Sequence, residues 1–220
     1  MKYEAIIFDL DGVLCSTDEY HYLAWKSIAD QLGIPFSRKK NDRLRGVSRM
    51  DSLEIVLEDY PGELSPAEKV RLAEQKNERY KKYLANLSAA DLSAEVSETL
   101  HVLRDRGLKL AVGSSSKNTP FILQQLGLGN FFDAVSDGNN ITRSKPDPEV
   151  FLKAAAMLDT APEKCLVVED AVSGAQAGHA GGMEVACVGD ASAAKAGDYN
   201  LNGFAQLLAV VRQENEDGTE

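Results

Sequence analysis

The sequence predicts an α/β protein whose core is a parallel sheet, with a helical unit inserted after the first strand. Four short apolar runs, at residues 5–8, 108–112, 166–168 and 184–188, are bounded by polar residues and are typical of buried parallel strands. Helical patterns separate the later runs. This alternation favours an open, Rossmann-like sheet with right-handed crossovers.

The helices expected in the core have recognisable ends. Gly107, Gly127 and Gly181 each follow a helical pattern. Glycine is the residue best suited to the position just after a helix. We therefore expect core helices at residues 96–106, 119–126, 148–158 and 173–180.

The stretch from about residue 17 to 87 is helical almost throughout and contains no convincing strand. We expect helices at residues 18–32, 48–60 and 65–87. The third begins with Ser65-Pro66-Ala67-Glu68, which combines an N-cap, a first-turn proline and a capping-box acid. Such a segment is best interpreted as a cap inserted into the core.

This pattern predicts the organisation of the chain. The core comprises residues 1–15 and 90–212, and residues 16–89 form the helical cap. The segments that join the cap to the core form a paired hinge. The acidic tail, residues 213–220, is expected to be disordered.

Composition excludes several classes of function. The chain has 24 Lys and Arg against 34 Asp and Glu, and its charge of -10 repels a polyanion, so we expect no nucleic-acid partner. The first apolar run stops at Asp9 and no other run is long enough to span a membrane, so we expect no membrane association. Cys15, Cys165 and Cys187 cannot all pair with one another, which favours a reducing cytoplasm. We expect a cytoplasmic monomer.

Carboxylates directly follow two of the predicted strands. Asp9 and Asp11 lie in Asp9-Leu10-Asp11-Gly12, and Glu169 and Asp170 follow the run at 166–168. In open α/β sheets, ligands bind beyond the carboxyl ends of the strands. Taken alone, an Asp-X-Asp-Gly segment is as readily a turn that satisfies its own backbone. Two further segments favour a functional site.

Serines and a lysine occupy these two segments, which are Gly113-Ser114-Ser115-Ser116-Lys117-Asn118 and Ser144-Lys145-Pro146-Asp147-Pro148. If all four segments share one edge of the sheet, they place acids, hydroxyls, N–H groups and one ammonium around one point. Hard oxygen ligands suit Mg²⁺, which shares its coordination shell with phosphate. The serines and Lys145 would complete a phosphoryl pocket.

In this order and spacing, the four segments resemble the haloacid dehalogenase (HAD) superfamily of phosphotransferases, over nearly the whole chain except the tail. The resemblance implies a HAD-type core with an inserted helical cap. It implies that Asp9 is a nucleophile that becomes an aspartyl-phosphate, and that Asp11 is the general acid/base. It also implies that Ser114 and Lys145 hold the transferring phosphate. The implied Mg²⁺ ligands are Asp9, Asp11 through its main-chain carbonyl, Glu169 and Asp170.

The cap narrows this resemblance to the β-phosphoglucomutase family. The similar segments are Gly46-Val47-Ser48-Arg49-Met50-Asp51-Ser52-Leu53, Glu19-Tyr20-His21, Gln75-Lys76-Asn77 and Ser116-Lys117-Asn118. In that family the arginine matching Arg49, with the loop at 116–118, grips the phosphate that is not transferred. His21 and Lys76 resemble the pair that couples substrate arrival to cap closure. The implied substrate-binding residues are Thr17, His21, Trp25, Gly46, Val47, Arg49, Lys76, Ser116, Lys117 and Asn118.

The resemblance implies a mutase that interconverts β-D-glucose 1-phosphate and D-glucose 6-phosphate. The route passes through an aspartyl-phosphate and β-glucose 1,6-bisphosphate. The alternative is a HAD sugar-phosphate phosphatase, in which water discharges the aspartyl-phosphate. A third hypothesis is a binding module on an inactive scaffold, which would have no use for a nucleophile facing its anion.

Several of these residues also have simpler interpretations. His21 and Trp25, four residues apart, can be core or hinge packing, and Arg49 and Lys76 can be solvated charges. The chain also departs from the family after the second hinge, where a Pro-Gly turn is common. Here Leu92-Ser93-Ala94 stands instead, and we expect Ser93 to cap the following helix.

Overall fold

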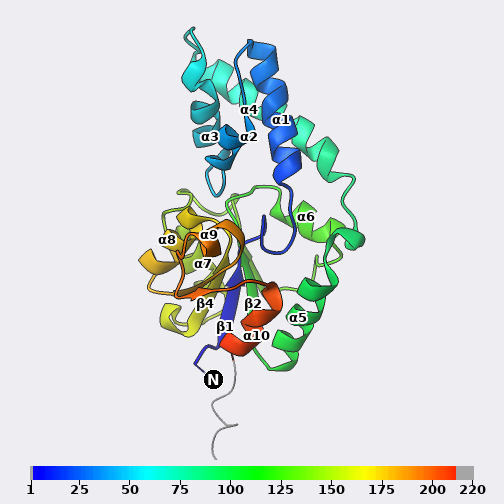
Figure 1. Ribbon diagram of the computed structural model, residues 1–220, viewed down its shortest axis with the longest axis vertical. Coiled ribbons are helices and arrows are strands. Elements are labelled where there is room, and N and C mark those ends of the chain that lie inside the picture. Colours follow the sequence, from blue (N-terminus) through cyan, green and yellow to red (C-terminus); the bar gives the residue numbers. More distant parts are fainter. Residues whose placement is uncertain (1, 212–220) are drawn as a thin grey trace, which may run out of the picture.

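The computed structural model describes residues 2–211, and its core is a six-stranded sheet in the order β3-β2-β1-β4-β5-β6 with every pairing parallel (Figure 1). The predicted α/β fold is confirmed, and the four predicted strands are found to within one residue at each end. The two edge strands, β3 and β6, were not expected. The strands are β1 (Ala5–Phe8), β2 (Lys109–Gly113), β3 (Ala134–Ser136), β4 (Cys165–Glu169), β5 (Glu184–Cys187) and β6 (Tyr199–Asn200).

The register of the central strands sets the position of the site. Phe8, the last residue of β1, lies opposite Val112 of β2 and Val168 of β4. The residues that follow these three positions therefore emerge side by side at one edge of the sheet. All three strands are apolar and buried, as expected for a sheet covered on both faces.

Helices cover both faces of the sheet. Successive residues of a strand point to opposite faces, so Ile6 and Phe8 join one hydrophobic cluster while Ala5 and Ile7 join the other. The four predicted core helices are found to within two residues at each end. The core helices are α5 (Ala94–Asp105), α6 (Thr119–Gln125), α7 (Glu149–Met157), α8 (Val172–Ala180), α9 (Gly189–Ala193) and α10 (Leu207–Val210), with 3₁₀ turns at Pro162–Lys164 and Phe204–Gln206.

The inserted segment forms a helical layer above the carboxyl edge of the sheet (Figure 1). It has its own apolar cluster, which includes Trp25, Ile28 and Leu53. The helix expected at 48–60 ends earlier and continues as a 3₁₀ turn. The elements are α1 (Asp18–Leu32), α2 (Arg38–Asp42), α3 (Arg49–Val56), η1 (Leu57–Asp59) and α4 (Pro66–Leu84).

Local capping explains several helix starts. The Ser65 hydroxyl accepts from the N–H of Glu68 while the Glu68 carboxylate accepts from the N–H of Ser65, which confirms the predicted capping box. Ser93 caps α5 by accepting from the N–H of Val96, as expected. The second connection between cap and core contains a further 3₁₀ turn, η2 (Ala89–Asp91).

Among the described residues, no helix is both long and apolar enough to cross a membrane. The acidic tail that the sequence predicts to be disordered, 213–220, lies outside the described residues.

Candidate active site

Three carboxylates meet where β1 and β4 end. The N–H of Asp9 donates to the carbonyl of Val168 at 2.9 Å, which fixes the first turn after β1 against β4. Carboxylate oxygens of Asp9, Glu169 and Asp170 all lie within 4.8 Å of one another, and the three residues are buried. The structure thus brings together acids that are 160 residues apart in the sequence.

Lys145 lies between two of these acids. Its Nζ is 2.5 Å from Asp9 Oδ1 and 2.5 Å from Glu169 Oε1, and its side chain is 1% exposed. Burial opposes the charged form of the lysine, but Asp9 and Glu169 outweigh burial and raise its pKa above the ordinary value. Lys145 is therefore a fixed ammonium at the point where β1 ends.

The negative charge that Lys145 leaves unbalanced at this point suits a bound cation. Burial, together with the charges of Asp9 and Glu169, raises the pKa of Asp170 to about 8. Gly12 makes the crowding possible, because a Cβ there would lie 2.0 Å from Asp170 Oδ2. One ammonium does not balance three carboxylates, and an all-oxygen donor set fits a hard divalent ion.

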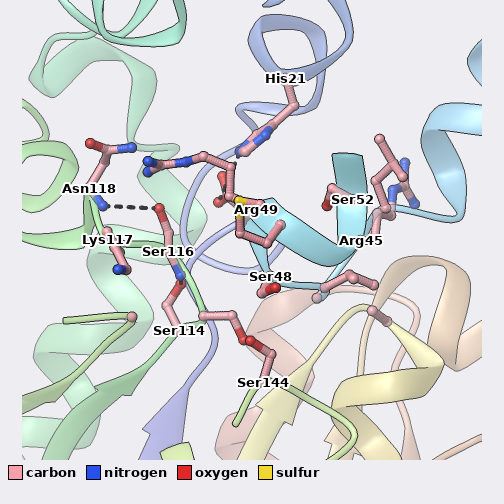
Figure 2. Close-up of a pocket in the computed structure, with 18 of the residues that line it drawn as sticks. His21, Arg45, Ser48, Arg49, Ser52, Ser114, Ser116, Lys117, Asn118 and Ser144 are labelled. Atoms are coloured by element: carbon pink, nitrogen blue, oxygen red, sulfur yellow. Dashed lines mark hydrogen bonds and ion pairs between the residues drawn. The ribbon is translucent and has the colours of Figure 1, made fainter. Parts of the chain in front are cut away.

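The loop after β2 presents hydroxyl and amide groups to the same point. The Ser114 hydroxyl accepts from the N–H of Ser116 at 3.2 Å, and the Ser116 hydroxyl accepts from the N–H of Asn118 at 3.2 Å. The Asn118 side-chain amide donates to Asn77 Oδ1 on α4 at 3.0 Å, so this loop is tied to the cap. Figure 2 shows Ser114, Ser116 and Asn118 along one side of a cavity and Ser48 and Ser52 along the other, with the Arg49 side chain reaching from α3 toward Asn118.

The cavity of about 500 Å³ lies between the core and the cap. Its size suits a small polar ligand rather than a polymer. The predicted site residues that line it are Asp9, Asp11, His21, Gly46, Val47, Arg49, Lys76, Ser114, Ser116, Lys117, Asn118, Glu169 and Asp170.

Arg49 places a second positive charge at this cavity. It is the first residue of α3, where Ser48 provides the N-cap. No carboxylate pairs with Arg49 among residues 2–211. Burial lowers its pKa, although arginine stays protonated at neutral pH. A cation in this position is poised to bind an anionic ligand.

Asp11 connects the core to the cap. The Thr17 hydroxyl donates to Asp11 Oδ1 and lies 2.8 Å from the hydroxyl of Tyr80. His21 Nε2 is 3.9 Å from Asp11 Oδ2, and Lys76 Nζ is 2.9 Å from His21 Nδ1. Burial raises the pKa of Asp11 to about 7, so its carboxyl group can both give and take a proton at neutral pH.

The Lys76–His21 pair is also perturbed. Burial and the nearby Arg49 lower the pKa of Lys76 to about 7, and burial and Lys76 lower the pKa of His21 well below its ordinary value. A neutral His21 can accept a hydrogen bond from the Lys76 ammonium.

Three predicted site residues do not line the cavity. Lys145 lies behind Asp9, and Thr17, 1% exposed, lies behind Asp11. Trp25 is 1% exposed in the apolar cluster of the cap, and Lys76 Nζ lies 5.0 Å from the centre of its ring. Trp25 therefore supports Lys76 from the cap interior and makes no direct contact with the cavity.

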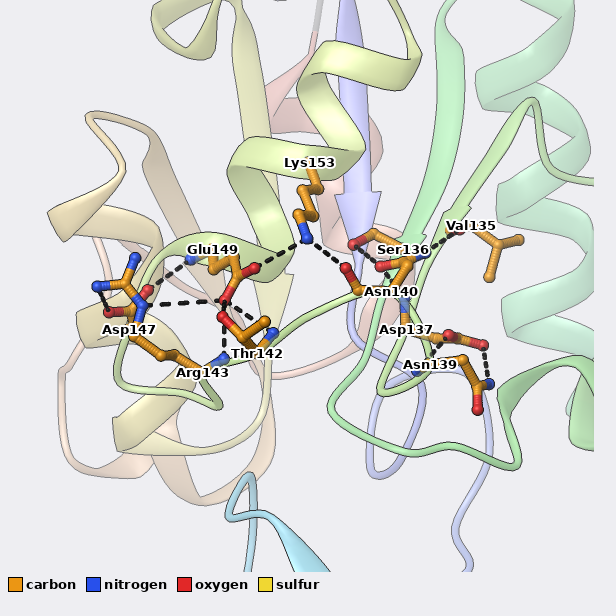
Figure 3. Close-up of polar contacts among 10 residues, drawn as sticks. All are labelled: Val135, Ser136, Asp137, Asn139, Asn140, Thr142, Arg143, Asp147, Glu149 and Lys153. Carbon is orange, nitrogen blue, oxygen red and sulfur yellow. Dashed lines mark hydrogen bonds and ion pairs between the residues drawn. The ribbon is translucent and has the colours of Figure 1, made fainter.

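Glu149, at the start of α7, clamps the loop that carries Lys145 (Figure 3). Its Oε2 accepts from the N–H of Thr142 at 3.0 Å, from the Thr142 hydroxyl at 2.9 Å and from the N–H of Arg143 at 2.7 Å. Its Oε1 lies 2.8 Å from Lys153 Nζ. These hydrogen bonds lower the pKa of Glu149 to about 2, with Lys153 the largest influence, so the clamp stays ionised at neutral pH. No sequence motif indicated this role.

Glu149→Ala should lower kcat/KM by about 10- to 100-fold, because three donors lose their acceptor and Lys145 shifts from its position. Glu149→Gln is the matched control. It keeps a carbonyl acceptor for the loop and loses only the charge that faces Lys153, so its loss should be smaller. Steady-state kinetics of both variants, with thermal unfolding to verify folding, checks this. Equal losses in the two would show that the backbone clamp is not the cause.

Sequence reasoning also missed Arg45, Asn41 and Ser52, all of which line the cavity, whereas Ser144, which lines it as well, belongs to the predicted segment 144–148. Ser52 and Arg45 lie in or beside the cap motif, and that proximity is the signal that could have indicated them. Asn41 had no comparable signal. It lies in the short helix α2, whose position at the cavity depends on tertiary contacts.

Comparison with known proteins shows the family of the chain. A family model for haloacid dehalogenase-like hydrolases matches residues 3–182. β-Phosphoglucomutase of Bacillus subtilis is 42% identical over 97% of this chain and 96% of its own length. A crystal structure of β-phosphoglucomutase from Clostridium difficile superposes with a TM-score of 0.88 at 35% identity, covering 93% of each chain. A phosphorylated carbohydrates phosphatase of Thermotoga maritima is 31% identical over 82% of each chain.

The resemblance inferred from the motifs is thus confirmed. By family match, sequence identity and superposition, this chain belongs to the β-phosphoglucomutases of the haloacid dehalogenase superfamily.

Proposed function

We propose that the protein interconverts β-D-glucose 1-phosphate and D-glucose 6-phosphate through an aspartyl-phosphate and β-glucose 1,6-bisphosphate. The observation that carries the proposal is a cation of the cap, Arg49, which lines the same cavity as the acid cluster and has no carboxylate partner in residues 2–211. A mutase must hold a phosphate at either end of a bisphosphate. One anion site at the nucleophile and another in the cap meet this requirement.

In this proposal, residues of the core carry out the phosphoryl transfer. A carboxylate oxygen of Asp9 attacks the phosphorus, so that an O–P bond to Asp9 forms while the O–P bond to the sugar breaks. Asp11 gives a proton to the departing sugar oxygen and, in the reverse direction, takes one from the attacking hydroxyl. Lys145 and Ser114 bind the phosphoryl oxygens and offset the repulsion between a carboxylate and a phosphate.

The proposed metal is Mg²⁺, held by Asp9, Glu169 and Asp170 with the main-chain carbonyl of Asp11. Phosphotransferases of this superfamily use a metal ion, and the acidic cluster has only hard oxygen donors. When bound, Mg²⁺ supplies positive charge that neutralises the phosphate approached by the nucleophile.

The cap is proposed to bind the rest of the substrate. Arg49, Ser116, Lys117 and Asn118 bind the phosphate that is not transferred, and the backbone of the Gly46-Val47 turn meets the sugar. Thr17, His21 and Lys76, with Trp25 beneath them, transmit closure of the cap to Asp11. The cap is assigned to residues 16–89 and the core to residues 1–15 and 90–212.

Arg49→Ala should weaken mutase turnover more than it changes the rate at which water hydrolyses the aspartyl-phosphate. In the proposal Arg49 binds the phosphate that the sugar keeps during transfer, and water as the acceptor has no such group. Removing a charge-assisted hydrogen bond to that phosphate should lower turnover by about 10- to 100-fold. Measuring glucose 6-phosphate and inorganic phosphate in the same reaction checks this. If both fall by the same factor, the second phosphate site is not at Arg49.

The alternative activity is that of a sugar-phosphate phosphatase, as in the Thermotoga relative. The two differ in what discharges the aspartyl-phosphate. An oriented hydroxyl can reach an effective molarity of about 10⁵ M or more, so a closed cavity lets sugar outcompete water. Closure of the cap therefore decides the product.

The test is incubation with Mg²⁺ and a trace of β-glucose 1,6-bisphosphate on α- and β-glucose 1-phosphate separately. Glucose 6-phosphate from the β anomer alone is the expected result. Free glucose and inorganic phosphate from both anomers would instead identify a phosphatase. No phosphoryl group on Asp9 and no turnover would favour a binding module.

We further propose that the enzyme works in the cytoplasm as a monomer and binds no nucleic acid. The three cysteines are free and buried, which accords with a reducing compartment. The charge of -10 accords with small sugar phosphates rather than a polyanion as partners. The sugar phosphates that we propose as partners are β-glucose 1-phosphate, glucose 6-phosphate and β-glucose 1,6-bisphosphate.

A further inference from the structure

Arg45 is a cap residue whose side chain reaches the core. It lies in the turn between α2 and α3, at the wall of the cavity. Its guanidinium pairs through Nη2 with Asp18, the first residue of α1, and through Nη1 with Asp190 of α9 at 2.5 Å. Asp18 belongs to the cap and Asp190 to the core. One side chain therefore bridges the two.

The backbone of the same turn also contacts the core. The Ser173 hydroxyl on α8 donates to the carbonyl of Arg45 at 3.4 Å. A Cβ on Gly46 would lie 2.6 Å from that hydroxyl oxygen, and Gly46 has φ of 73°. Glycine permits both the left-handed turn and the close approach. The guanidinium is thus held over α9 by main-chain contacts as well as by its own ion pairs.

The bridge differs from the other ion pairs of the molecule. Throughout residues 2–211, every other pair between Lys or Arg and a carboxylate joins two cap residues or two core residues. Arg43, two residues earlier, pairs with Glu58 inside the cap. The Asn118–Asn77 hydrogen bond also joins core and cap, and Figure 2 shows Asn118 on the opposite side of the cavity from Arg45.

We infer that Arg45 is a positioning residue that holds the cap closed over the cavity, with Asp18 orienting its guanidinium and Asp190 receiving it on the core. The inference rests on the proposed mutase function, in which closure decides whether the aspartyl-phosphate meets sugar or water. The Asp190 side chain is 78% exposed, so its ion pair is weak enough to break when product leaves. Asp18 keeps the planar guanidinium preorganised while the cap is open.

Asp190→Asn tests this inference, because it removes the receiving charge without changing a residue that lines the cavity. The ratio of inorganic phosphate to glucose 6-phosphate formed should rise about two- to fivefold, the range expected for an exposed ion pair. Asp190→Glu should restore the wild-type ratio. Salt should raise the ratio in the wild type, since it screens the pair, and should change it little in Asp190→Asn.

Glu58→Gln is the matched control. It breaks an exposed arginine–carboxylate pair that lies wholly within the cap, so the product ratio should stay at the wild-type value. An unchanged ratio in Asp190→Asn, or an equal rise in Glu58→Gln, would overturn the inference.

A second measurement does not depend on activity. Spin labels at Glu63→Cys on the cap and Gln176→Cys on α8 occupy exposed positions, whereas the three native cysteines are buried. Pulsed dipolar spectroscopy should show a longer or broader cap-to-core distance when Asp190→Asn is added, and no change with Glu58→Gln. An unaltered distance distribution in Asp190→Asn would refute the bridge.

The two measurements separate the possible failures. If the wild type forms no glucose 6-phosphate, the proposed function fails, while the distance measurement still tests the bridge.

Discussion

Asp9→Asn is expected to lower turnover of β-glucose 1-phosphate by about 10⁴-fold or more, the largest effect of any single substitution in the protein. The amide is a poor nucleophile, so no O–P bond to residue 9 forms. The substitution also removes a charge that Lys145 contacts at 2.5 Å, but Glu169 still pairs with that ammonium. The variant should therefore fold, and circular dichroism and thermal unfolding can verify this.

The measurement that isolates the nucleophile is trapping of the covalent intermediate. Wild-type protein treated with Mg²⁺ and β-glucose 1,6-bisphosphate, then quenched in acid, should carry one phosphoryl group on the peptide that contains Asp9. The Asp9→Asn protein should carry none. A phosphopeptide elsewhere in the chain, or phosphorylation of the variant at wild-type level, would show that Asp9 is not the acceptor.

The strands and the carboxylates of the site could be predicted because both depend on local sequence. A buried parallel strand is a short apolar run, and β1, β2, β4 and β5 each contain one. The polar residues that end such runs must emerge at the same edge of the sheet. Asp9, Glu169 and Asp170 were found in this way.

The elements that the sequence did not indicate are too short to show a period. β3 has three residues and β6 has two, and both lie at the ends of the sheet order. α2 has five residues, fewer than two turns. These elements depend on tertiary contacts, such as the hydrogen bond from Ser114 N–H to the Ser136 carbonyl at 3.0 Å.

The ionic contacts of Arg45 and Glu149 could not be predicted for a similar reason. Arg45 is 27 residues from Asp18 and 145 from Asp190, and, unlike Lys145 and the acids at the strand ends, these residues lie in no motif that indicates a shared position. Glu149 is close in sequence to Thr142 and Arg143, but its role depends on the path of the loop between them. A role that depends on the path of a loop can be recognised only from the three-dimensional structure.

Asp11→Asn should lower phosphoryl transfer to and from the sugar by about 10²- to 10⁴-fold, the usual contribution of a general acid/base. In the wild type, burial raises the pKa of Asp11 to about 7, and the Thr17 hydroxyl and His21 lie beside its two oxygens. An amide has a similar shape and can keep contacts with these neighbours. It cannot exchange a proton, so the sugar hydroxyl would have to attack or leave without assistance.

The leaving group allows this role to be separated from that of Asp9. Acetyl phosphate releases acetate, which needs no proton as it departs, so Asp11→Asn should still be phosphorylated on Asp9 by this donor at near the wild-type rate. Transfer from that aspartyl-phosphate to glucose 6-phosphate should be slow, and rapid-quench measurement of both steps checks the contrast. Mg²⁺ affinity should be little changed, because the side chain of Asp11 is not a proposed ligand. Loss of Mg²⁺ binding, or equal loss of the two steps, would mean that Asp11 serves the metal site instead of the proton.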